Sequence, residues 1–217
     1  MPQTWREAIA NRKFLLHLGG WLLGLALFII ILPYYFNNIL LHIPGVQLND
    51  PIFYFLTPRD WSFQILILIF GAPALFFLFN FRDPEKILLS IQCYVVVNFL
   101  RILSLYLFTL EAPDGIIPLV DPFLEKVAYG GNAVFVKDLF FSGHTSTLFI
   151  VFLIEKRKSI KFILLISTLL VGLLLVWQRV HYSIDVLGAI FVSWCVYWLF
   201  TKMNDRVDFK KRDIMPK

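Results

Sequence analysis

Long apolar runs separated by short polar segments dominate the pattern of this 217-residue chain. A helix needs about 20 residues to cross a hydrocarbon core of about 30 Å. Backbone groups in lipid must find hydrogen-bond partners within the segment, which favours helices over open strands. The pattern therefore predicts an all-α, polytopic membrane protein with six transmembrane helices, at about residues 14–32, 62–80, 87–109, 140–154, 160–178 and 182–200.

The composition supports this class, because 59% of the residues are hydrophobic and 16% are charged. Such a chain cannot surround one water-soluble core with a polar coat. The sequence contains no repeat or second domain. We expect a cytoplasmic juxtamembrane segment at 1–13, one transmembrane domain at 14–200 and a basic cytoplasmic tail at 201–217.

The net charge of +5 is distributed unevenly over the loops. Fifteen of the 20 Lys and Arg residues lie in the N-terminal segment, the loop at 81–86, the segment 155–161 and the tail after Thr201. This asymmetry follows the positive-inside rule and predicts that both termini are cytoplasmic. Basic residues beside the spans suit anionic lipid headgroups, so we expect lipid partners and no nucleic acid. The sequence predicts no oligomeric state.

Ionisable residues inside or beside apolar spans are costly and mark candidate sites. They are Arg101, His144, Arg179, His181 and Asp185. The 37 residues from His144 to His181 correspond to two crossings, so both histidines are expected at the outer face. Asp185 follows His181 by four residues and would share its helix face. Arg101, in the third span, can extend its side chain outward to the same level.

This combination predicts phosphoryl transfer. An Asp–His pair makes His181 a candidate nucleophile, and His144 can serve as general acid. The arginines suit phosphate oxygens. If Ser142, Gly143, His144 and Thr145 open the short fourth span, their backbone N–H groups form an anion site at a helix N-terminus. The sum of these features is transfer through a phosphohistidine.

Two other interpretations of these residues remain open. Polar pairs can simply hold membrane helices together, and either motif alone would be compatible with that role. His144, His181 and Asp185 could also bind zinc, although the nearby arginines disfavour a divalent cation.

The motifs resemble those of a known family. "SGHT" followed by "HYSIDV" resembles the type-2 phosphatidic acid phosphatase superfamily of lipid phosphatases and phosphotransferases. More closely, "KDLFFSGHTSTLF" and "RVHYSIDVLGA" are similar to two motifs of its sphingomyelin synthase branch, with Asp138 at the acidic position and Ser183 in place of the usual Thr. "RILSLYLFTLEAP" resembles another motif of that branch and gives Arg101 the Arg position.

The chain also departs from the superfamily. The usual first motif, a Lys followed after six residues by Arg-Pro, is absent, and Leu175 stands where an Arg usually precedes the second histidine. The synthase branch lacks these features too, so the departures favour it over phosphatases of soluble substrates. Its own first motif is only faintly echoed by "LNDP" at 48–51.

The resemblance implies a role for each motif residue. His181 would attack the phosphorus of a phospholipid headgroup ester, with Asp185 orienting its ring. His144 would protonate the departing diacylglycerol oxygen and then deprotonate the hydroxyl of a ceramide-like acceptor. Arg101 and Arg179 would hold the phosphate, and Asp138 would position the turn. No metal or cofactor is implied.

Other functions stay open at the level of sequence. The same His, His and Asp site could use water, as a lipid phosphate phosphatase does. A transporter or lipid-binding protein could use the histidines and arginines for ligand contact alone. The small size favours a bacterial cytoplasmic membrane, with the active site on the periplasmic face.

Overall fold

The computed structural model describes residues 4–119 and 136–206, and the named elements in this part of the chain are helices. Each of the six expected spans corresponds to one helix. In chain order these are α2 (Arg12–Asn38), α3 (Ser62–Asn80), α4 (Pro84–Leu107), α6 (Gly143–Ile154), α7 (Lys158–Trp177) and α8 (Ser183–Arg206). Five are long and apolar enough to cross a membrane, and α6, with 12 residues, is shorter.

The ends of several helices differ from the expected ones. Helix α2 continues past the expected end at 32 and includes Pro33. Helix α8 continues to Arg206, so the first part of the expected tail is helical, and residues 207–217 lie outside the described residues. The juxtamembrane segment contains a short helix, α1 (Trp5–Ala10), capped by Thr4. The loop between α2 and α3 adds two 3₁₀ turns, η1 (Leu40–His42) and η2 (Pro51–Tyr54).

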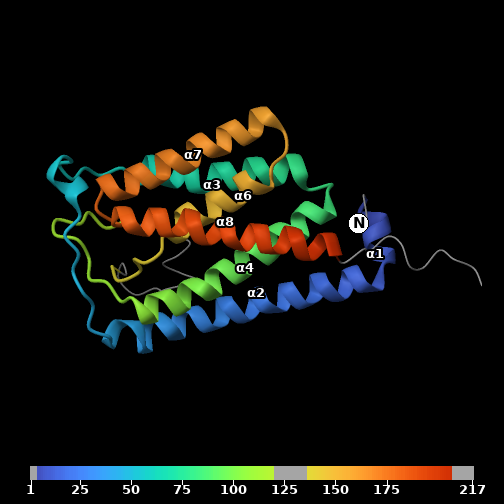
Figure 1. Ribbon diagram of the computed structural model, residues 1–217, viewed down its shortest axis with the longest axis horizontal. Coiled ribbons are helices and arrows are strands. Elements are labelled where there is room, and N and C mark those ends of the chain that lie inside the picture. The colour runs from blue at the N-terminus through green and yellow to red at the C-terminus, as the bar shows by residue number, and fades with distance from the viewer. Residues whose placement is uncertain (1–3, 120–135, 207–217) are drawn as a thin grey trace, which may run out of the picture.

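Helix α6 lies at the centre of the bundle and packs against α3, α4, α7 and α8 (Figure 1). Its apolar residues belong to the main core, where Leu148, Ile150 and Ile154 are at most 2% exposed. A helix that is apolar on all sides can pack against neighbours on every side, and α6 does so at the centre of the bundle. Helix α2 packs mainly against α4, at the edge of the bundle (Figure 1).

A cluster of polar side chains holds the C-terminal end of α6. Glu155 is fully buried and accepts hydrogen bonds from the backbone N–H groups of Lys156 and Arg157, each at 2.8 Å, and from Asn80 Nδ2 at 2.7 Å. Lys86 Nζ donates to Asn80 Oδ1 at 2.7 Å. Burial raises the pKa of Glu155, but these hydrogen bonds and the charge of Lys86 hold it below its usual value. The cluster joins the α3–α4 turn to the α6–α7 turn and so fixes the C-terminal end of α6.

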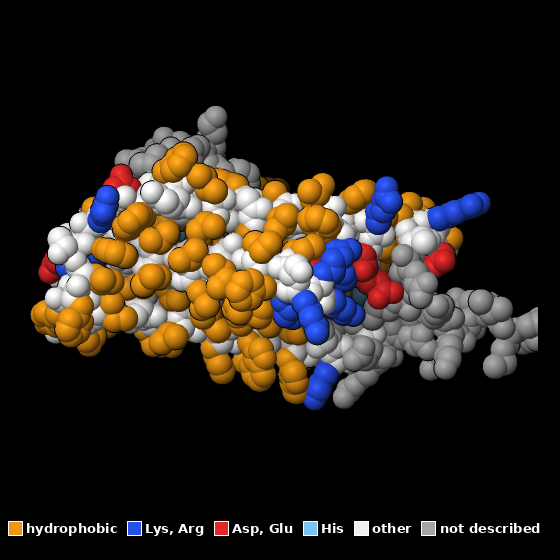
Figure 2. Space-filling model, turned by 90° about the horizontal axis from the view of Figure 1, so that it is seen from above, with side chains coloured by type: hydrophobic (Ala, Val, Ile, Leu, Met, Phe, Trp, Pro, Cys, Tyr) orange, Lys and Arg blue, Asp and Glu red, His pale blue; other side chains and the backbone are white. Residues whose placement is uncertain are grey.

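Apolar side chains form a broad band over the surface, and charged side chains gather towards its two ends (Figure 2). Large apolar residues such as Ile30, Phe63 and Leu187 are more than 60% exposed. Such a surface suits hydrocarbon rather than water. Helix α1, the start of α2 and the end of α8 lie at the same end of the bundle (Figure 1). We expect that end to be cytoplasmic, as the charge distribution predicts.

Candidate active site

Helix α6 begins at the predicted "SGHT" segment. Ser142 is its N-cap, and Ser142 Oγ accepts a hydrogen bond from the backbone N–H of Thr145 at 3.3 Å. The hydroxyl of Thr145 also donates to Ser142 Oγ, at 3.1 Å. Both residues are fully buried, whereas His144, in the first turn, is half-buried. The short polar segment is therefore a helix N-terminus that presents His144, as the sequence predicts.

His181 and Asp185 form a pair at the start of α8. His181 Nδ1 lies 3.2 Å from Asp185 Oδ2, and the two side chains are 2% and 0% exposed. The expectation that both lie on one helix is wrong, because α8 begins at Ser183 and His181 lies in the preceding turn. The carboxylate reaches back to this turn and also accepts from the backbone N–H of Tyr182 at 2.9 Å. Asp185 thus fixes the imidazole and the turn together.

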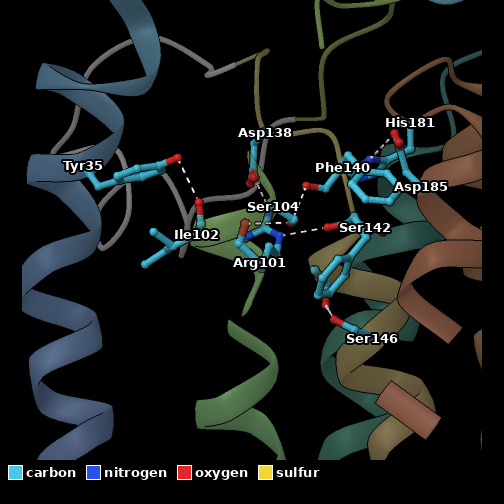
Figure 3. A network of polar contacts seen from close by, with 12 residues as sticks. Tyr35, Arg101, Ile102, Ser104, Asp138, Phe140, Ser142, Ser146, His181 and Asp185 are labelled. Carbon is cyan, nitrogen blue, oxygen red and sulfur yellow. Dashed lines mark hydrogen bonds and ion pairs between the residues drawn. The ribbon is translucent and has the colours of Figure 1, made fainter. Parts of the chain in front are cut away.

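A backbone hydrogen bond connects the two motifs. The N–H of Ser142 donates to the carbonyl oxygen of Asp185 at 3.1 Å. Asp185 therefore holds His181 with its carboxylate, as Figure 3 shows, and the start of α6 with its carbonyl oxygen. Because His144 is two residues after Ser142, this hydrogen bond joins the first turn of α6, which carries His144, to the first turn of α8, which follows His181.

Arg101 on α4 completes this constellation. Arg101 Nε donates to the carbonyl oxygen of Phe141 at 3.0 Å, and its guanidinium forms an ion pair with Asp138 (Figure 3). A Cβ added at Gly143 would lie 3.0 Å from Arg101 Cζ, so glycine lets the guanidinium pack against the start of α6. Arg101 is 7% exposed and contacts the segment directly before His144, so its side chain reaches the level of that histidine while it is buried in the protein.

Arg179 takes a different position from the other predicted residues. Its guanidinium donates to the carbonyl oxygens of Asp114 and Phe53 and lies over the ring of Phe53. Its backbone has φ of 60°, a left-handed conformation that costs a non-glycine residue about 1–3 kcal/mol. Arg179 lines a pocket of about 370 Å³ with Asp50 and Asp114, and the other lining residues do not include the histidines. Its contacts therefore join outer loops.

Sequence reasoning missed Asp50 as a partner of the site. Asp50 Oδ2 accepts from the backbone N–H of Ser183, the first residue of α8, at 2.6 Å. Asp50 therefore caps the helix that carries Asp185, across 133 positions of sequence. The faint "LNDP" resemblance contains this residue and was the available signal.

Two further contacts brace the turn that carries His181. Tyr182, 1% exposed, donates its hydroxyl to the carbonyl oxygen of Glu111 at 3.0 Å and accepts from the N–H of Leu48 at 3.2 Å. Burial raises the pKa of Tyr182, which keeps the phenol protonated as a donor. A hydrogen bond from Lys137, at 2.7 Å, lowers the pKa of Glu111 and keeps that carboxylate charged. The outer loops thus form one frame around the two motifs.

The described residues include no group of three or more His, Cys, Asp or Glu side chains that could hold a metal ion. This observation gives no support to the zinc interpretation of His144, His181 and Asp185.

Comparison with known proteins identifies the segment that contains both motifs. Residues 137–202 match the family model of the PAP2 superfamily C-terminal domain. The matched segment includes Asp138, the start of α6, and the His181–Asp185 pair. No curated protein matches the chain.

Proposed function

We propose that the protein is a membrane lipid phosphotransferase, on the premise that residues 137–202 match the family model of the PAP2 superfamily, that of the type-2 phosphatidic acid phosphatases. Superfamily membership supports lipid phosphatase or phosphotransferase chemistry in general, and the apolar helices suit a lipid substrate. The specific proposal is transfer of a phospho-headgroup from a phospholipid to a ceramide- or diacylglycerol-like acceptor. The relation to the sphingomyelin synthase branch belongs to this proposal.

The His181–Asp185 contact is the observation that carries the proposal. With Asp185 Oδ2 at His181 Nδ1, the ring presents Nε2 as its nucleophilic nitrogen, and the carboxylate stabilises the positive charge that develops on the ring. In the first step, Nε2 forms a bond to phosphorus while the bond from phosphorus to the diacylglycerol oxygen breaks. His144 donates a proton to that oxygen, which leaves as an alcohol.

The second step reverses this chemistry with a new alcohol. His144, now neutral, accepts the proton of the acceptor hydroxyl, whose oxygen attacks the phosphorus. The N–P bond breaks, and the ring of His181 returns to its starting state. Water in place of the lipid alcohol gives a phosphatase, which is the alternative that superfamily membership also supports.

Charge near the phosphoryl group is supplied by Arg101 and by the N-terminus of α6. A guanidinium suits phosphate oxygens, and Arg101 packs directly against Gly143 in the first turn of α6. A helix N-terminus adds a partial positive charge at the same place. Asp138 would hold Arg101 in position through their ion pair. In this proposal Arg179 braces the loops that contain Phe53 and Asp114. Its positive charge acts on the phosphate only at long range.

The product of the reaction tests the proposal. Purified protein in liposomes would receive phosphatidylcholine, phosphatidylethanolamine, phosphatidylglycerol or phosphatidic acid, each labelled at phosphorus, with and without ceramide or diacylglycerol. Transfer predicts a labelled lipid that forms only with acceptor, whereas release of phosphate or phospho-headgroup into water identifies a phosphatase. Acid-labile label on the protein should appear in both cases and be lost in His181→Ala. If no lipid in this panel is converted, the proposed function is wrong.

The proposed location is a bacterial cytoplasmic membrane, with the site at the periplasmic face. The site lies at the end of the bundle opposite α1 (Figure 1). The positive-inside pattern supports a cytoplasmic position for α1 and therefore an outer position for the site.

A further inference from the structure

An apolar groove lies on the membrane-facing side of the site helices. Its volume is about 260 Å³. The lining residues come from four helices and are almost all apolar: Leu25 of α2, Pro73 and Phe77 of α3, Ser90, Ile91 and Tyr94 of α4, and Thr147, Ile150 and Val151 of α6.

Two faces of the groove continue directly into the candidate active site. On α6, Thr147 and Val151 follow His144 at spacings of three and then four residues, which places all three on one helix face. On α4, Tyr94 lies seven residues, about two turns, before Arg101. The outer ends of these two faces are therefore the histidine and the arginine of the site.

Along these two helix faces, the lining changes from polar at the site to apolar in the groove. At the outer end, Arg101 packs against Gly143, and the backbone of α6 begins there. One helical turn further along α6, the hydroxyl of Thr147 donates a hydrogen bond to the carbonyl oxygen of Gly143, at 2.9 Å. The hydroxyl of Ser90 is likewise bonded to the carbonyl oxygen of its own helix at Ile87, at 2.8 Å. The hydroxyls of Thr147 and Ser90 are thus both bonded within their own helices, and the other lining residues of α2, α3 and α6 are apolar.

The groove opens at the lateral surface of the bundle, between the helices. Phe77, on its α3 wall, is 44% exposed, and Leu25, on its α2 wall, is half-buried. Helix α2 packs mainly against α4, so the groove lies beside α4 with α2 and α3 as its two walls. In a chain whose exposed surface at this level is apolar, the molecules available to fill such a groove are lipids.

We propose that this groove binds an acyl chain of the lipid substrate, whose phosphate then lies between Arg101 and His144. A phospholipid has the same order of groups as the path, with an anionic phosphate followed by a hydrocarbon chain. The chain enters sideways from the membrane between α2 and α3, and its burial aligns the phosphate with the nucleophile. This inference rests on the proposed function, because it assigns the chain of the substrate of that same site.

A larger side chain that fills the groove should raise KM for long-chain substrates and leave KM for short-chain substrates nearly unchanged. Leu25→Trp enlarges the α2 wall without altering α6 or the site. For the dioleoyl form of the phospholipid that the wild type converts, we expect KM to rise about tenfold or more, because a blocked apolar pocket removes chain binding. For the dihexanoyl form we expect kcat and KM within about twofold of wild type. Phe77→Trp, on the opposite wall, should act in the same direction.

Matched variants on the same helices provide the controls. Leu23→Trp and Leu78→Trp place the same ring at positions that are 62% and 66% exposed and that do not line the groove. Both should leave the chain-length preference unchanged. The inference is overturned if the groove variants and the control variants affect the dioleoyl substrate equally, or if neither groove variant changes it.

Photocrosslinking tests the groove in the wild-type protein and does not depend on folding of a variant. A phospholipid with a diazirine in the middle of one acyl chain should label peptides that contain Leu25, Phe77 and Ile91, and excess unlabelled lipid should compete. Labelling spread over exposed positions such as Leu23 and Leu187, without enrichment at the groove, contradicts the inference. Because this measurement needs no turnover, an inactive wild type would refute the proposed function and leave the groove to be decided by the crosslinks.

Discussion

Asp185 makes three contacts that together organise the site. Its carboxylate holds the ring of His181 and the N–H of Tyr182, and its carbonyl oxygen holds Ser142. The second carboxylate oxygen, Oδ1, is buried and has no hydrogen-bond partner among the described residues. The carboxylate and the carbonyl oxygen of Asp185 thus hold His181 and the start of α6 in one arrangement.

Asp185→Asn tests this role. The amide keeps the size of the side chain but removes the negative charge that would stabilise a positively charged His181 ring. We expect kcat to fall about 100- to 10,000-fold, by analogy with other His–Asp pairs, while KM stays near wild type. Steady-state kinetics in liposomes provides the measurement.

Asp60→Asn is the matched control for this change. Asp60 lies at the same end of the bundle, and its carboxylate accepts a hydrogen bond from the backbone N–H of Ser62 at 2.9 Å, a contact that the amide oxygen of Asn can also make. Asn caps helices as well as Asp does, so activity should be retained. Equal losses of kcat in both variants would contradict the assigned role of Asp185.

At the scale of the elements, α6 is the helix on which the site depends. Its 12 residues span about 18 Å, less than the hydrocarbon core of about 30 Å. Its outer end is held by Ser142 and Asp185, and its inner end by Glu155. A helix this short remains in place at the centre because its neighbours hold both ends.

Close approach between α7 and α8 is a second requirement at this scale. A Cβ added at Gly172 of α7 would lie 2.8 Å from Val186 Cγ1 of α8. We expect Gly172→Ala to lower the free energy of unfolding by about 1–3 kcal/mol through overpacking. It should also reduce activity, because Val186 follows Asp185 directly. Thermal unfolding in detergent measures the first effect.

Gly71→Ala separates overpacking from helix propensity. Gly71 also lies within a helix, α3, but a Cβ there would meet no atom within 4 Å. Alanine should therefore stabilise that helix by up to about 1 kcal/mol. If Gly172→Ala is as stable as Gly71→Ala, the two helices do not meet in the described way.

At the scale of the whole molecule, the charge distribution and the arrangement of the helices distinguish the same two ends of the bundle. The positive-inside pattern assigns α1 and the α6–α7 turn to the cytoplasm, and the described structure gathers these segments at one end, opposite the site (Figure 1). The loop that contains η2 lies at the other end.

Cysteine labelling of intact cells tests this orientation. Tyr54→Cys, at a position 75% exposed in η2, should react with a membrane-impermeant maleimide. Ser159→Cys, an exposed position at the start of α7, should react only after permeabilisation. The wild type is the control, because Cys93 is buried and Cys195 half-buried within the spans. The reverse pattern of labelling would invert the proposed topology.

The sequence by itself determined the features that depend on local pattern. Apolar runs predicted the helices, because any segment in hydrocarbon must satisfy its own backbone. "SGHT" predicted the start of α6, because a serine cap acts within three residues. The four-residue spacing predicted the His181–Asp185 contact, although the contact forms through a turn rather than along a helix. The family resemblance added the expected chemistry, and the match of residues 137–202 to the PAP2 superfamily supports its general class.

Only the tertiary structure decided the contacts between distant segments. Arg101 is buried because Asp138 pairs with its guanidinium and Gly143 leaves space for it. Arg179 joins the outer loops, while Asp50 reaches across the fold to cap α8. These outcomes depend on how helices cross and how loops return, and many loop paths satisfy the same apolar pattern. The sequence therefore predicted which ionisable residues lie in or beside apolar spans at an energetic cost. Packing between remote segments determined which of these residues meet.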